Sequence, residues 1–349
     1  MKMKYSSLLV SGLALATVAT TTVSADDTGV ANGGQLTITK DFGLTDGVLS
    51  PSTTFTFQVS KGQPTTPSEE KDGLHVYEGK MDGLTDTATV TYDNNSTTTD
   101  KTKTVNIDFS KVSYDKPGIY RYTVSEQQGN VPGVTYDTKQ YTVDVYVLTQ
   151  TDGTYKPQYI VSNENGSTSK KPVKFDNTIQ TTSLKVTKKV TGNAGDKNKE
   201  FTFSIVLNDA NQTKNYTTGS VTMTITKKDN SSSTVQIPVT NTSTEFKLKD
   251  GESATIDKLP QGIQYEVNEV SEDGYAQSAT INKDTTKTST EEYALKDLVT
   301  TDNTPDEIVV TNTKNSTTPT GVAMTVAPYV GLTILALGGV LYVFKKRKA

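Results

Sequence analysis

The chain has 349 residues, a formal net charge of −4, no cysteine and a single histidine. The lack of cysteine excludes disulfides, thiol catalysis and thiolate zinc sites, and one histidine cannot form a multi-histidine metal site. The acidic balance argues against nucleic acid as a partner, because Lys and Arg must neutralise the phosphates in such complexes. We therefore expect neither a metal nor a cofactor.

The N-terminus has the features of a secretory signal peptide, residues 1–25. Lys2 and Lys4 supply the positive charge, residues 8–18 are mostly apolar, and the segment 23–25 is typical of a cleavage site. Cleavage after Ala25 would leave a secreted chain.

Short runs of alternating apolar and polar residues follow. β-branched and aromatic residues fill the apolar positions, and Asp-Gly pairs separate many of the runs, as expected for half-buried strands joined by turns. Five such runs are 36–40, 55–59, 141–147, 201–205 and 221–225. The predicted fold class is all-β, built from β-sandwiches.

One pattern occurs twice, which predicts two tandem domains, residues 26–179 and 180–316. Each half opens with Leu-x-Ile/Val-x-Lys, continues through Tyr-x-Val-x-Glu and closes with an apolar-x-apolar-x-Asn segment. The linker near Gln180 is very short, so we expect a stiff, elongated pair.

Strand parity directs the three polar residues that end these segments into the apolar core. Residues i, i+2 and i+4 of a strand share a face, so each Lys, Glu and Asn lies on the same face as its apolar neighbours. The six residues are Lys40, Glu126 and Asn177 in the first half, and Lys188, Glu269 and Asn312 in the second. The same rule selects Lys188 over its neighbour Lys189.

Burial predicts a reaction among these groups. It shifts the pKa of a Lys down and that of a Glu up. A neutral Lys amine is a nucleophile, and a protonated Glu could donate a hydrogen bond to the Asn carboxamide oxygen. Attack on the carboxamide carbon would release ammonia and leave a Lys–Asn isopeptide bond. Two alternatives stay open: a hydrogen-bonded triad without a bond, and lysines that extend to solvent at strand ends.

The last segment, residues 317–349, predicts a sorting signal. An uncharged, largely apolar run of 23 residues, 322–344, is long enough to cross a bilayer, and the basic tail 345–348 would stay cytoplasmic. The motif before the run consists of Thr317, Thr318, Pro319, Thr320 and Gly321.

This motif resembles the Gram-positive sortase signal, in which a transpeptidase cuts between Thr and Gly. The bond here is Thr320–Gly321. Thr317 stands where the usual signal has Leu, which implies a sortase specialised for an unusual motif. The alternative is a plain membrane anchor, whereas a sorted chain would contact the membrane only as a precursor.

Long motifs resemble the backbone pilins of streptococci, of the T-antigen type. They are 36–40, 122–126, 131–138, 249–253 and 319–329. The resemblance implies two Ig-like, Cna-B-like domains in a rod. It also implies the bonds Lys40–Asn177, formed with Glu126, and Lys188–Asn312, formed with Glu269.

The resemblance implies an acceptor lysine that receives the Thr of the next subunit. Lys170 matches its position, and Lys171 is the second choice. The implied function is that of a shaft subunit in a covalent, cell-wall-anchored pilus, with no enzymatic activity beyond autocatalytic bond formation. The implied partners are identical subunits, a pilus sortase and minor pilins, and a host surface is left open. The alternative is a singly displayed wall-anchored adhesin.

Overall fold

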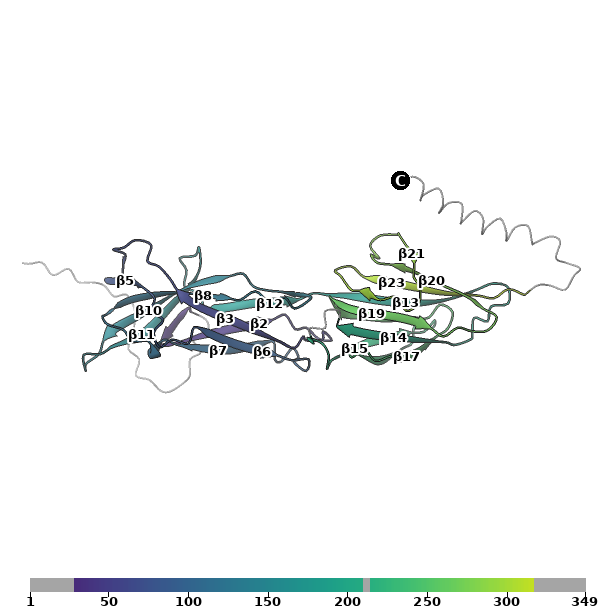
Figure 1. Cartoon of the computed structure of the whole chain (residues 1–349), viewed down its shortest axis with the longest axis horizontal. Coiled ribbons are helices and arrows are strands. Elements are labelled where there is room, and N and C mark those ends of the chain that lie inside the picture. The colour runs from purple at the N-terminus through teal and green to yellow at the C-terminus, as the bar shows by residue number, and fades with distance from the viewer. Residues whose placement is uncertain (1–27, 210–213, 317–349) are drawn as a thin grey trace, which may run out of the picture.

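The structure, a computed structural model, describes residues 28–209 and 214–316. Two β-domains lie end to end in an elongated rod (Figure 1). Apart from one 3-10 turn, η2 (Phe109–Lys111), the described residues form strands, turns and loops, so the predicted all-β fold class is confirmed. Within these residues no helix is long and apolar enough to cross a membrane. The expected signal peptide and sorting span lie outside them.

The first domain consists of two facing sheets. The larger has the strand order β1-β11-β10-β8-β3-β6, with β5 beside β8 and β4 beside β5. Its strands are β1 (Val30–Asn32), β3 (Thr53–Lys61), β4 (Glu70–Lys71), β5 (Leu74–Glu78), β6 (Thr87–Tyr92), β8 (Gly118–Glu126), β10 (Gln140–Thr149) and β11 (Tyr155–Glu164). The smaller sheet has the order β7-β2-β12-β9. Its strands are β2 (Gln35–Phe42), β7 (Thr102–Asp108), β9 (Val134–Thr135) and β12 (Val173–Ile179).

The second domain also has two sheets. One has the order β16-β15-β18-β13-β23-β20-β21. Its strands are β13 (Thr181–Thr191), β15 (Ser220–Thr226), β16 (Ser232–Pro238), β18 (Ser253–Pro260), β20 (Ala276–Asn282), β21 (Glu291–Glu292) and β23 (Asp306–Thr313). The other has the order β17-β14-β19-β22. Its strands are β14 (Phe201–Asp209), β17 (Thr244–Leu248), β19 (Ile263–Glu269) and β22 (Val299–Thr300).

The first and last long strands of each sandwich are parallel neighbours. β2 pairs with β12, which places Lys40 opposite Phe175, and β13 pairs with β23, which places Lys188 opposite Val310. In both pairs the Asn lies two residues beyond the residue opposite the Lys. Because residues i and i+2 share a face, the Lys and the Asn point to the same side of the sheet.

Alternating burial turns that side toward the core. In β2 every second residue from Leu36 to Phe42 is buried, and in β19 every second residue from Ile263 to Glu269 is buried. β8 and β19, which carry the Glu residues, belong to the sheets that face these parallel pairs. The Lys, the Glu and the Asn of each domain therefore point into the space between the two layers.

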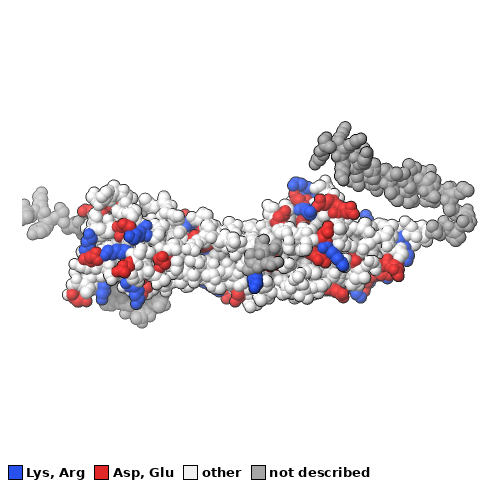
Figure 2. Space-filling view, in the orientation of Figure 1, with Lys and Arg blue, Asp and Glu red and all other residues white. Residues whose placement is uncertain are grey.

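The junction between the domains is a packed contact. Only Gln180 separates β12 from β13, and the loop after β2 inserts Leu49 into the hydrophobic core of the second domain. Asn94 Nδ2 donates to the backbone oxygens of Ser50, at 2.7 Å, and of Asn215 in the second domain, at 2.6 Å. On the face shown in Figure 2, charged side chains are interspersed over both domains and sparse over this junction. A linker of one residue and these contacts hold the two domains in line.

Candidate cross-linking sites

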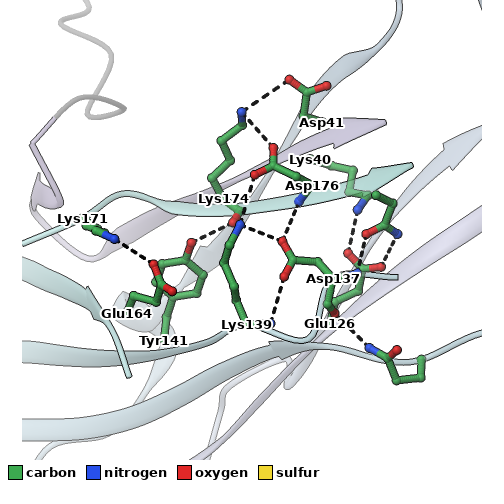
Figure 3. Close-up of polar contacts among 12 residues, drawn as sticks. Lys40, Asp41, Glu126, Asp137, Lys139, Tyr141, Glu164, Lys171, Lys174 and Asp176 are labelled. Atoms are coloured by element: carbon green, nitrogen blue, oxygen red, sulfur yellow. Dashed lines mark hydrogen bonds and ion pairs between the residues drawn. The ribbon is translucent and has the colours of Figure 1, made fainter. Parts of the chain in front are cut away.

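The first site lies between the sheets of the first domain, where β2, β8 and β12 contribute one residue each (Figure 3). Lys40, Glu126 and Asn177 are 0, 5 and 2 % exposed. Lys40 Nζ is 2.7 Å from Glu126 Oε2, and Asn177 Nδ2 donates to Glu126 Oε1 at 2.5 Å. One carboxyl group thus connects the amine and the carboxamide.

The surroundings of this site favour uncharged forms. Phe55 places its ring 4.5 Å from Lys40 Nζ, so little water can solvate the amine. Burial lowers the pKa of Lys40 even though Glu126 acts to raise it, and burial raises the pKa of Glu126 even though Lys40 and Asn177 act to lower it. The two shifts bring the pair toward a neutral amine and a protonated acid.

The carboxamide oxygen of the first site has a different partner from the one expected. Glu126 was predicted to donate to Asn177 Oδ1, whereas that oxygen accepts the backbone N–H of Asp137 at 2.8 Å. Glu126 instead accepts from the carboxamide nitrogen. The reason is positional: Asp137 follows β9, which pairs with β12 beside Asn177.

The second site repeats the three residues on β13, β19 and β23. Lys188, Glu269 and Asn312 are buried, and Lys188 Nζ is 2.8 Å from Glu269 Oε1. Phe201 places its ring 4.3 Å from the amine, and burial lowers the pKa of Lys188. The neighbouring Lys189 is exposed, as strand parity predicts.

The second site differs from the first around its carboxamide. Within the described residues, neither Nδ2 nor Oδ1 of Asn312 has a hydrogen-bond partner. The second oxygen of Glu269 accepts from Gln277 Nε2 instead. Gln277 lies on β20 directly opposite Asn312. A buried amide without partners costs about 1–3 kcal/mol per group, so the unbonded second site is strained in a way that the first is not.

Both acceptor candidates lie in the loop between β11 and β12, and both are exposed. Lys171 is held in place: its Nζ is 2.9 Å from Glu164, and its backbone N–H and C=O both bond to Ser162. The Lys170 side chain has no hydrogen bond or ion pair with any described residue. Lys170 therefore presents the freer amine of the two.

The sorting-motif residues Thr317, Thr318, Pro319, Thr320 and Gly321 lie outside the described residues. The described chain ends at Ser316, whose N–H donates to Asn193 Oδ1 at 2.7 Å. The chain is thereby fixed to the far end of the second domain one residue before the motif.

Other features bear on function only weakly. In the part of the chain that the structure describes, no group of three or more His, Asp or Glu side chains could hold a metal ion. The loop near residues 63–69, to which the sequence assigns no role, is attached to the first domain through Glu69, whose carboxylate is 3.0 Å from Arg121 Nη1.

Known proteins match almost the whole chain. Residues 36–180 match the family of Spy0128-like isopeptide-containing domains, and residues 182–314 match a domain family of unknown function. A pilin of Streptococcus pyogenes serotype M1 is 39 % identical over 366 aligned residues, which cover 99 % of this chain and all of the relative. The chain belongs to the streptococcal major pilin family.

Solved structures of major pilins are similar to this chain. The major pilin T3.2 of Streptococcus pyogenes is 41 % identical with a TM-score of 0.73, and the major pilin T-13 is 38 % identical with a TM-score of 0.67. Each comparison covers 82 % of this chain and 99 % of the other. The two-domain architecture is therefore that of a major pilin, a structural subunit of a cell-surface pilus.

Two residues of this pilin's candidate sites were missed by sequence reasoning, Asp137 and Gln277. Asp137 falls in the stretch 131–138 that carried the family resemblance, but β9 has only two residues, so no alternation indicates where its neighbours point. Gln277 lies on β20, whose outward residues are exposed. Strand pairing rather than sequence period places Asp137 beside Asn177 and Gln277 beside Glu269.

Proposed function

We propose that this pilin is the shaft subunit of a cell-wall-anchored pilus. A sortase would join Thr320 of one subunit to Lys170 of the next, and each domain would be closed by its own Lys–Asn isopeptide bond. The observation that carries the proposal is the burial of a Lys, a Glu and an Asn inside each apolar core, with the Lys amine 2.7 Å from the Glu carboxylate in the first domain and 2.8 Å in the second. The partners would be identical subunits, a pilus sortase and minor pilins.

The internal reaction balances without any co-reactant. A proton first passes from Lys40 Nζ to Glu126. The Nζ lone pair then forms a bond to Asn177 Cγ, and the C=O π pair moves onto Oδ1. When this pair returns, the Cγ–Nδ2 bond breaks. Glu126 gives its proton to Nδ2 before this bond breaks, so the departing group is ammonia, and it then takes the second proton from Nζ. Glu126 is well placed for this exchange because its two oxygens contact Nζ and Nδ2 separately.

The Lys–Asn bond would stabilise each domain against unfolding. Both loops that it closes exceed 120 residues. The chain-entropy relation used for disulfides gives about 5 kcal/mol for such a loop. Unlike a disulfide, an amide does not respond to reductants, which suits a chain without cysteine.

The intersubunit link is tested in cells that assemble the pilus. Wall extracts run on a denaturing gel should give a ladder of covalent multimers, and Lys170→Ala should reduce it to monomer while the subunit still folds. Lys171→Ala is the matched control and should leave the ladder intact. If only Lys171→Ala abolishes the ladder, the acceptor is Lys171 rather than Lys170. A single wall-anchored species in the parent strain would favour the displayed adhesin.

A further inference from the structure

We propose that the backbone N–H of Asp137 is an oxyanion donor for bond formation in the first domain, a group for which the described residues of the second domain offer no counterpart. This inference rests on the isopeptide chemistry proposed above. It assigns a catalytic role to a main-chain atom that contacts the reacting carboxamide directly, at 2.8 Å from Asn177 Oδ1.

The position of this donor follows from strand pairing. β9 pairs with the end of β12, with Thr135 opposite Thr178 and Val134 opposite Ile179. The chain then leaves β9 and passes the Asn177 side chain, so the N–H of Asp137 reaches the carboxamide oxygen. Strand β12 thus supplies the electrophile while its neighbour supplies the donor.

The Asp137 side chain fixes this arrangement (Figure 3). Its Oδ2 accepts from the backbone N–H of Asp176, at 2.7 Å, and from Lys139 Nζ, at 2.9 Å. Its Oδ1 accepts from the backbone N–H of Lys139 at 2.9 Å. Burial acts to raise the pKa of Asp137, but these hydrogen bonds outweigh it and lower the pKa, so the carboxylate stays ionised at neutral pH. Because Asp176 precedes Asn177, the donor is tied to the strand that carries the reacting group.

The donor matters because of where charge develops. When Lys40 Nζ attacks Asn177 Cγ, negative charge accumulates on Oδ1, and a preset donor in a water-excluded core stabilises that charge more than the uncharged carboxamide. The loss of one such donor in other acyl-transfer sites costs roughly 10²–10³ in rate. Glu126 cannot substitute, since its two oxygens contact the amine and the departing nitrogen.

The second domain provides an internal reference. Its carboxamide oxygen, Asn312 Oδ1, has no hydrogen-bond partner among the described residues. A change at Asp137 should therefore alter the first reaction and leave the second as it was. Comparison of the two within one chain separates chemistry from general effects on folding or solution conditions.

The test follows both cross-links during refolding. The mature chain, residues 26–320, is collected unbonded from inclusion bodies in urea, with the time-zero mass as a check, and is diluted into native buffer. Quenched samples are digested, and the cross-linked peptides Lys40–Asn177 and Lys188–Asn312 are quantified by mass spectrometry. Asp137→Pro removes the N–H. Asp137→Asn, the matched control, keeps the N–H and an acceptor oxygen for its neighbours.

The expected result is a first cross-link slowed by roughly 10²–10³-fold in Asp137→Pro. In Asp137→Asn it should be slowed by less than about tenfold, since a neutral acceptor still bonds to Asp176 and Lys139. The second cross-link should keep its rate in both variants. An unchanged first rate in Asp137→Pro would overturn the oxyanion role while leaving the isopeptide chemistry standing. A parent chain that forms neither cross-link would overturn both.

A second measurement applies if the proline variant fails to fold. The Glu126→Ala chain should retain its carboxamide, so NMR can detect a scalar coupling across the hydrogen bond between the Asp137 amide and Asn177 Cγ. Observation of this coupling supports the donor role, and its absence in a folded first domain overturns it.

Discussion

The two sites of this pilin contain the same three residues but position them by different means. In the first, Glu126 and the Asp137 N–H occupy both ends of the Asn177 carboxamide before any reaction. In the second, Gln277 holds the glutamate and the Asn312 carboxamide has no partner within the described residues. The same Lys, Glu and Asn therefore occur in both sites, whereas the neighbouring strands decide how these side chains are held.

The energetic consequence also differs. An unbonded first site has its polar groups satisfied, so bond formation there gains mainly from the closed loop. An unbonded second site contains a buried carboxamide that has no partner among the described residues, at a cost of about 1–3 kcal/mol per unsatisfied group. Bond formation in the second domain would relieve this strain as well as close a loop.

The largest expected effect comes from removing either glutamate. Glu126→Ala should prevent the first bond and Glu269→Ala the second, each at a cost of about 5 kcal/mol in the free energy of unfolding of its own domain. The intact mass of each variant should be one ammonia molecule below the mass of its own sequence, whereas the intact mass of the parent should be two ammonia molecules below the mass of its sequence. Thermal unfolding and proteolysis report which domain is weakened.

Glu266→Ala is the matched control, because this residue lies on the same strand as Glu269 but on the opposite face. It should keep both bonds. A parent mass equal to the plain sequence mass would contradict the cross-links altogether.

The next effect concerns the dependence of the second domain on the first. Leu49→Ala removes a first-domain side chain from the second core. It should therefore destabilise the second domain by about 2–5 kcal/mol and the first by much less. Hydrogen exchange resolved by domain measures both. Val48→Ala is the control, since Val48 is only half-buried. Equal losses in the two domains would mean that Leu49 stabilises the junction as a whole.

A smaller effect is expected at Gln277. Gln277→Leu removes the hydrogen bond to Glu269 and should slow the second cross-link about tenfold, the equivalent of one hydrogen bond to a charged group. The first cross-link should not change. Ser278→Ala, at the exposed neighbouring position, serves as the control. If Gln277→Leu leaves the rate of the second cross-link unchanged, Gln277 contributes only to packing.

The smallest effect is the pH dependence of the first bond. Burial lowers the pKa of Lys40 and raises that of Glu126. The charged pair, ammonium and carboxylate, and the neutral pair, amine and carboxylic acid, hold the same number of protons. The reactive form then needs no net proton exchange with water, and the rate should vary little between about pH 6 and 8. It should fall in acid, where the carboxylate and the amine are both protonated. Refolding time courses measure this, and a tenfold rise per pH unit would instead indicate a solvated lysine.

Sequence alone predicts the burial of the Lys, Glu and Asn of each site, because alternation in long strands is a strong signal. Lys188 and Lys189 are adjacent, yet parity separates the buried one from the exposed one. The groups that hold the reactants are less accessible to such reasoning. Asp137 acts through a main-chain atom beside a two-residue strand, and Leu49 packs into a core that belongs to the other half of the chain. Periodicity shows that a side chain is buried but not which partner buries it.

The parallel pairing of first and last strands determines how tension would travel along a fibre linked through Lys170. Pull would enter the first domain at Lys170, follow β12 and pass through Gln180 directly into β13. The first sandwich would then lie beside this path, and the proposed Lys40–Asn177 bond would keep the stretched strand from separating from its sheet.

In the second domain the path must cross from β13 to β23. The proposed Lys188–Asn312 bond would provide that crossing, and residues 189–311 would then form a side loop that bears no tension. With the same bond proposed for both domains, the first domain would thus support a strand under tension, whereas the second would transmit the tension through its cross-link.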